Sequence, residues 1–177
     1  MKTWSVVCPT NRPELHIKFL EYWDELFTKH DVHLVIMQDL PKDDPELAKV
    51  VKEKKYEVTL LNWTHVKAKH IPKQTDMVRS WAMYYVWKNG LSEYVMTLDD
   101  DTKPLYNDIF EEYEREFEKG AVLSEFFDVG ALTSSGLQMR GFPYPDRKRV
   151  PVGVQYGGWS GVLDYDAATQ LANQKIS

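Results

Sequence analysis

The sequence predicts an α/β fold in which a mostly parallel sheet is covered by helices on both faces. Short apolar runs of strand length alternate with stretches whose apolar residues recur at helical spacing. Polar or turn-forming residues follow these runs, as expected where a buried strand leaves a sheet. Parallel strands need long crossover connections, and the intervening helical stretches supply them.

Four segments are predicted as strands, at residues 4–8, 33–37, 56–61 and 94–98. Each is almost continuously apolar, which is typical of a strand buried on both faces. Pro9 closes the first segment, and polar residues follow the second and fourth.

Helices are predicted between these strands. One begins at Pro13, where a missing N–H does no harm, and its apolar face includes Phe19, Leu26 and either Tyr22 or Trp23. A short helix is expected at 44–54. A longer one is expected from residue 74 or 75 to the stop signal Asn89-Gly90.

The remaining chain differs in composition. Residues 109–119 form an acidic helical pattern and 128–134 a further strand, whereas 136–161 are rich in Gly, Pro, Arg and aromatic residues. That last stretch suits ordered loops or hairpins over a cleft. We therefore expect one domain over 1–177, with a nucleotide-binding part at 1–104 and a sugar- or acceptor-side part at 105–177.

Length and composition exclude several classes. The chain has 177 residues, a formal net charge of −5 and one cysteine, Cys8. A disulfide framework and a cysteine-built zinc site are excluded, and the charge argues against a general nucleic-acid binder. No apolar run is long enough to span a bilayer and no signal peptide is present, so a cytoplasmic protein without a membrane partner is expected.

The most informative segment is Asp99-Asp100-Asp101, directly after the fourth strand. Three adjacent carboxylates repel one another unless a cation lies among them. A hard divalent ion, Mg²⁺ or Mn²⁺, would relieve this repulsion and could also bridge a diphosphate. The alternative is a solvated acidic turn.

Other candidates lie at strand ends and at the start of the third helix. Ligands bind at the carboxyl ends of parallel strands, where Arg12 and Asp39 follow the first and second strands. Asp39 could accept hydrogen bonds from a base or ribose, or cap the next loop. Lys73 or Arg79 could bind phosphate while Asp76 orients a sugar or base. Alternatively, Asp76 and Arg79 form a helix salt bridge.

Candidates in the last third of the chain are cationic or aromatic. Arg140 and Arg147 lie in a basic loop and could neutralise a departing diphosphate. Gly158 and Trp159 offer close backbone approach beside an indole platform. Further along, Asp164 and Asp166 could accept sugar hydroxyls or cap a helix. For each, an ordinary solvent-facing loop, turn or cap is the alternative.

Several of these motifs occur together, in order, in one known family. The acidic triplet at 97–101 after a helix bearing Arg79 resembles the metal motif of GT-A glycosyltransferases. The later motifs Arg140-Gly141-Phe142-Pro143, Gly158-Trp159 and residues 164–171 resemble the reversibly glycosylated polypeptides, which are UDP-arabinopyranose mutases. Residues 7–10 and 35–39, which include Pro9, Thr10 and Asp39, match that family's nucleotide-binding strand ends.

The resemblance implies a GT-A-like, Rossmann-like fold and a UDP-sugar substrate. It implies that Asp99, Asp100 and Asp101 bind Mn²⁺ or Mg²⁺ with the diphosphate. It also implies that Arg140 becomes reversibly glycosylated and that Arg147 is a second functional arginine. The family chains continue beyond this motif set, so this chain is expected to lack their C-terminal part.

Three functions are compatible with these expectations. The first is a UDP-pentose mutase, and the second is a transferase that moves a sugar to a glycan, a protein or a modified DNA base. The third is a non-catalytic nucleotide-sugar-binding half that needs a partner chain, as a homo- or hetero-oligomer. Nucleic acid is expected only as such an acceptor.

Overall fold

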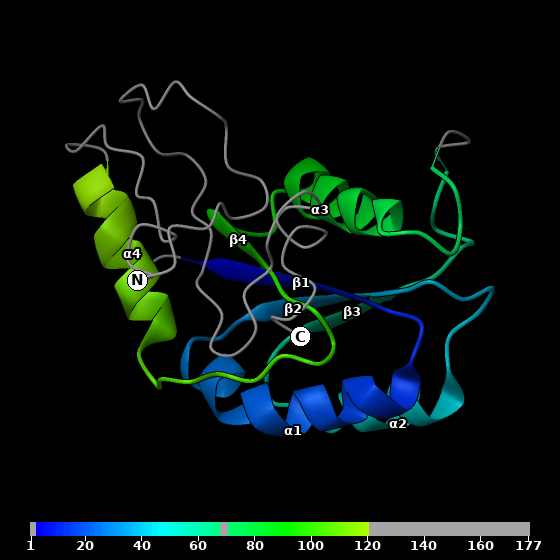
Figure 1. Cartoon of the computed structure of the whole chain (residues 1–177), viewed down its shortest axis with the longest axis horizontal. Helices are drawn as coiled ribbons and strands as arrows, with labels where there is room; N and C mark the ends of the chain where they lie inside the picture. The colour runs from blue at the N-terminus through cyan, green and yellow to red at the C-terminus, as the bar shows by residue number, and fades with distance from the viewer. Residues whose placement is uncertain (1–2, 68–70, 121–177) are drawn as a thin grey trace, which may run out of the picture. The chain divides into compact units, whose positions relative to one another are not determined.

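The computed structural model describes residues 3–67 and 71–120 (Figure 1). The chain divides into two units, Met1–Phe110 and Glu111–Ser177, and the sheet belongs to the first. The predicted strand at 128–134, the loops at 136–161 and the candidate residues from Arg140 onward lie outside the described residues.

The sheet has four strands in the order β3-β2-β1-β4, and every described pair is parallel. The strands are β1 (Trp4–Thr10), β2 (His33–Gln38), β3 (Val58–Leu61) and β4 (Tyr94–Thr97). In this register Val7 lies opposite Val35 on β2 and Thr97 on β4. The predicted α/β class with a parallel sheet is confirmed.

Strand β1 continues two residues past its predicted end, through Pro9 to Thr10. Its pairing with β4 ends at Val7, where the Leu98 N–H donates to the Val7 carbonyl. The backbone N–H and C=O groups of successive residues point to opposite sides of a strand, so the backbone of Pro9, like that of Val7, is directed toward the β4 side. Its missing N–H therefore removes no ladder hydrogen bond, and the strand carries Thr10 to the edge where ligands bind.

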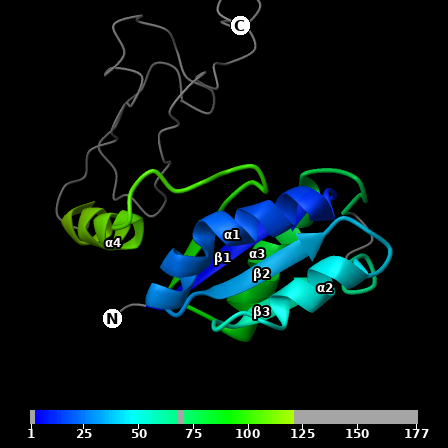
Figure 2. The same cartoon turned by 90° about the horizontal axis from the view of Figure 1, so that it is seen from below.

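Two helices, α1 (Pro13–Lys29) and α2 (Pro45–Val51), cover one face of the sheet, and α3 (Met77–Asn89) covers the other (Figures 1 and 2). On α1 the choice left open in the sequence is resolved: Trp23 is buried and Tyr22 is exposed. The α1 core consists of large side chains at helical spacing: Phe19, Leu20, Trp23, Leu26 and Phe27.

Helix α3 packs on β1, β2 and β3 through small aliphatic residues. Val78, Ala82 and Val86 lie four residues apart and contact the apolar cluster of the sheet. The larger Met77, Tyr84 and Trp87 of the same helix are exposed. Gly90 ends the helix with φ of 59°, a left-handed conformation that glycine adopts without a Cβ clash.

A fourth helix, α4 (Ile109–Gly120), matches the predicted acidic helix. On its surface a guanidinium nitrogen of Arg115 lies 3.7 Å from a carboxylate oxygen of Glu112, an ion pair at i,i+3 spacing. Within the described ranges, none of the helices combines the length and apolarity that crossing a bilayer requires.

Candidate functional site

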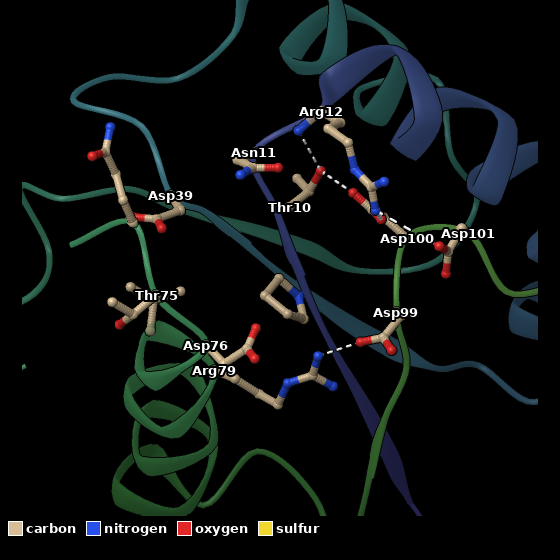
Figure 3. A pocket seen from close by; sticks show the side chains of 13 residues that line it. Thr10, Asn11, Arg12, Asp39, Thr75, Asp76, Arg79, Asp99, Asp100 and Asp101 are labelled. Atoms are coloured by element: carbon tan, nitrogen blue, oxygen red, sulfur yellow. Dashed lines mark hydrogen bonds and ion pairs between the residues drawn. The ribbon is translucent and has the colours of Figure 1, made fainter. Parts of the chain in front are cut away.

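An open cleft of about 490 Å³ lies at the carboxyl ends of the strands (Figure 3). Four separate chain segments line it: the end of β1, the residue after β2, the start of α3 and the triplet after β4. The lining residues are Pro9, Thr10, Asn11, Arg12, Asp39, Gln74, Thr75, Asp76, Val78, Arg79, Asp99, Asp100 and Asp101. The three polar strand ends singled out in the sequence are therefore brought together.

Asp100 is the buried member of the triplet, with 4% of its side chain exposed. One carboxylate oxygen accepts a 2.6 Å hydrogen bond from the Thr10 hydroxyl, and the other forms an ion pair with Arg12. The Thr10 hydroxyl also accepts from the Arg12 backbone N–H at 3.0 Å. Hydrogen bonding to Asp100 raises the pKa of Arg12. These contacts tie the end of β1 to the segment after β4.

Asp99 and Asp101 have different surroundings. Asp99 forms an ion pair with Arg79, whose guanidinium also donates to the Thr97 hydroxyl at 2.7 Å. Asp101 is 62% exposed, and one of its oxygens lies 3.8 Å from the Arg12 guanidinium. Arg79 therefore pairs with Asp99 and Thr97 and not with Asp76 at the start of its own helix. The salt bridge between Asp76 and Arg79 that the sequence offered as an alternative is not formed.

Asp76 lies at the N-cap position of α3, but its side chain makes no capping hydrogen bond. It lines the cleft near Arg79 (Figure 3). Its carboxylate thus remains able to contact a ligand.

Asp39 lines the cleft on the side away from Arg12 and Asp100 (Figure 3). Asp39 is only 7% exposed, and its backbone N–H donates to the Thr10 carbonyl at 2.8 Å. One carboxylate oxygen accepts from the indole N–H of Trp63 at 2.5 Å. Sequence reasoning missed Trp63, although its place just after β3 was a usable signal.

Lys73 is not among the residues that line the cleft. Its ammonium group lies over the ring of Trp63, 4.9 Å from the centroid, in a cation–π contact. Lys73 therefore contacts Trp63, which in turn contacts Asp39.

Cys8 and His16 lie buried beneath this edge of the sheet, with Sγ and Nδ1 3.6 Å apart. Burial lowers the pKa of His16 to about 4, against a smaller opposing effect of Asp100. Burial also raises the pKa of the Cys8 thiol well above its usual range. The pair is thus neutral near pH 7, and Cys8 lacks the thiolate that a reactive cysteine needs.

The triplet fits a hard divalent ion in donor type and charge, because it offers only carboxylate oxygens. The carboxylates are not arranged around a common ion position, because Asp100 is paired with Arg12 and Asp99 with Arg79. Among the side chains that the structure describes, no three acidic, histidine or cysteine groups are placed to hold an ion together. To ligate one, Asp99 and Asp100 would have to exchange arginine partners for the ion.

The chain is similar to plant UDP-arabinopyranose mutases over nearly all its length. A probable UDP-arabinopyranose mutase 1 of Pisum sativum is 30% identical over an alignment of 177 positions, which covers 94% of this chain and 46% of that protein. UDP-arabinopyranose mutase 2 of Arabidopsis thaliana is 28% identical, covering 97% and 48%. The resemblance inferred from the motifs is confirmed, and the chain spans about half the length of these relatives.

No protein-family model matches the chain. Among solved structures, S. aureus TarS 1–349 aligns with a TM-score of 0.46 at 16% identity, over 81% of this chain and 38% of that one. TarS in complex with UDP-GlcNAc gives a TM-score of 0.45 at 18% identity, covering 81% and 37%.

Proposed function

We propose that this chain binds a UDP-sugar in the strand-end cleft and belongs to an enzyme of the mutase or glycosyltransferase type. One observation carries the proposal. Residues from β1, β2, α3 and the segment after β4 converge on one cleft, in a chain similar over 94% of its length to a UDP-arabinopyranose mutase. The cytoplasmic location remains a prediction.

The charge of the cleft supports a bound cation as part of this proposal. Its lining holds five aspartates (Asp39, Asp76 and the triplet) and two arginines, a formal charge of 2 − 5 = −3. A diphosphate would be repelled by this surplus unless further positive charge were present. We therefore include Mn²⁺ or Mg²⁺ at Asp99, Asp100 and Asp101, where the ion would stabilise negative charge on a departing diphosphate.

The chain's own cations would act on the same group. Arg12 and Arg79 flank the triplet, and a guanidinium donates two parallel hydrogen bonds to phosphate oxygens. If the ion takes over the carboxylates, these arginines become available to the phosphates. Asp39 and Asp76 would accept hydrogen bonds from the nucleoside and sugar, because a carboxylate only accepts.

Reactivity at the sugar is assigned by resemblance to residues outside the described part of the chain. Arg140 would be the arginine that becomes reversibly glycosylated, with Arg147 as a second functional arginine. Gly158, Trp159, Asp164 and Asp166 would contact the sugar. The chemistry would be transfer of the anomeric carbon from the UDP phosphate oxygen to an Arg140 nitrogen, with loss of a proton from that nitrogen. Ring opening and reclosure of the sugar would follow, and the anomeric carbon would then return to the UDP phosphate oxygen as the nitrogen regains its proton.

Titration calorimetry with UDP tests the binding proposal. We expect UDP to bind in Mn²⁺, and the affinity to fall at least tenfold when a chelator removes the ion. Asp101→Asn should weaken Mn²⁺-dependent binding about tenfold without loss of stability, since Asp101 is exposed. Glu21→Gln, which removes an exposed carboxylate on α1 away from the cleft, is the matched control. Absence of UDP binding under every condition would refute the proposal.

Product analysis separates the remaining alternatives. A mutase converts UDP-arabinopyranose to UDP-arabinofuranose without any acceptor, whereas a transferase releases UDP only when a glycan, protein or DNA acceptor is added. Radiolabelled UDP-sugar should label the wild-type chain but not Arg140→Ala. Binding without turnover, in the chain alone, would instead support a nucleotide-sugar-binding half that needs a partner.

A further inference from the structure

The indole of Trp63 makes a hydrogen bond to a carboxylate that lines one side of the cleft. Its N–H donates to Asp39 Oδ1 at 2.5 Å, although Trp63 itself lies in the loop after β3 and does not line the cleft. The backbone is fixed as well, because the Trp63 N–H donates to the Leu40 carbonyl at 3.0 Å. Trp63 is therefore held twice to the segment after β2, through its side chain to Asp39 and through its backbone to Leu40.

The surroundings of this hydrogen bond decide which oxygen of Asp39 is left for a ligand. Asp39 is almost buried, so water cannot freely replace a lost partner. The indole nitrogen can only donate, and it occupies only one of the two carboxylate oxygens. The ammonium of Lys73 also contacts the indole ring, 4.9 Å from its centroid. The second oxygen of Asp39 is left to accept from whatever enters the cleft.

We propose that Trp63 is a positioning residue for nucleotide recognition, which holds Asp39 so that its second oxygen accepts a hydrogen bond from the nucleoside of the UDP-sugar. This rests on the proposed function. Asp39 lies across the cleft from Arg12 and Asp100, so a diphosphate at the arginines would direct the nucleoside toward it (Figure 3). The donor is either the imide N–H of uracil or the 2′-hydroxyl of the ribose.

The test measures discrimination between nucleotides in the full chain. UDP is compared with 3-methyl-UDP, which lacks the imide N–H, and with 2′-deoxy-UDP, which lacks one hydroxyl. Wild type should bind one of the two analogues about tenfold or more weakly than UDP, which identifies the donor. Trp63→Phe keeps a six-membered aromatic ring for Lys73 but removes the N–H together with the rest of the pyrrole ring. It should bind UDP fivefold to tenfold more weakly and discriminate less.

A double variant shows whether Trp63 acts through Asp39. In an Asp39→Asn background, Trp63→Phe should change UDP affinity less than twofold. Trp87→Phe removes another indole N–H, on a side chain of α3 that is 75% exposed, and should bind all three nucleotides like wild type. A merely structural role of Trp63 would weaken all three nucleotides equally in both backgrounds.

The outcomes separate this inference from the proposed function. If wild type binds UDP and Trp63→Phe retains full discrimination, the role of Trp63 is refuted and the proposed function stands. If wild type binds no UDP, both are refuted. Should Trp63→Phe fail to fold, Asp39→Asn alone must abolish the discrimination, and retained discrimination would overturn the inference.

Discussion

Arg12 and Asp100 are 88 residues apart in sequence and form an ion pair across the carboxyl ends of β1 and β4. The guanidinium is half exposed, with 48% of its side chain accessible, whereas the carboxylate is buried at 4%. The two partners therefore contribute differently. Loss of the arginine leaves a buried charge, while loss of the charge leaves an arginine that water can solvate.

Arg12→Ala should destabilise the chain by about 1–3 kcal/mol, because the buried carboxylate keeps only Thr10 as a partner. Adding Asp100→Asn to Arg12→Ala should recover part of this loss, since the charge is then removed. Urea unfolding of both single variants and the double variant measures the coupling. Lys18→Ala, an exposed cation on α1, is the control. Strictly additive losses would contradict a direct pair.

Arg79→Ala should bind Mn²⁺ more tightly than wild type in the absence of nucleotide, by roughly fivefold, since a charge that competes for Asp99 is gone. The same variant should bind UDP more weakly in Mn²⁺, because a phosphate donor is lost. Calorimetry with Mn²⁺ alone and then with UDP measures both effects. Lys88→Ala is the control, because it removes the same charge about 13 Å further along α3. It should change neither the Mn²⁺ affinity nor the UDP affinity. Weaker Mn²⁺ binding by Arg79→Ala would show that the arginine and the ion do not compete.

Trp23→Phe should cost about 1–2 kcal/mol although the replacement remains aromatic. The Trp23 indole N–H donates to the Thr102 carbonyl at 3.1 Å, and the ring is 1% exposed. The variant leaves that carbonyl without its partner and a void beside it. Thermal unfolding provides the measurement, with Tyr22→Phe on the exposed face as the control. Equal melting temperatures for the two variants would contradict this role.

Stability should fall as the pH falls from about 6.5 toward 4, because of His16. The folded-state pKa of His16 is lowered to about 4 by burial, against an ordinary value of 6.5. Between these values the unfolded chain binds a proton that the folded chain does not, so acid favours unfolding by up to about 3 kcal/mol. Urea unfolding of wild type and His16→Gln at pH 7 and pH 5 measures this. An unchanged pH slope in the variant would refute it.

The local pattern of the sequence determined the elements of the first unit. Apolar runs of strand length, Pro13 at a helix start and Asn89-Gly90 at a helix end are signals that act within a few residues, and the structure follows them closely. Parallel strands then required that the polar residues after the first, second and fourth strands meet at one edge. For this reason the cleft residues Thr10, Arg12, Asp39 and the triplet could be predicted without a structure.

The partners of those residues could be decided only by the tertiary structure. Side-chain pairing depends on distances across the sheet, and sequence spacing carries no information about which arginine reaches which carboxylate. Arg79 thus pairs with Asp99 and not with Asp76, and Lys73 lies over Trp63 instead of in the cleft. The sequence by itself determined that the residues at the strand ends form the cleft, and packing across β1, β2 and β4 decided which of them is buried, paired or free to bind.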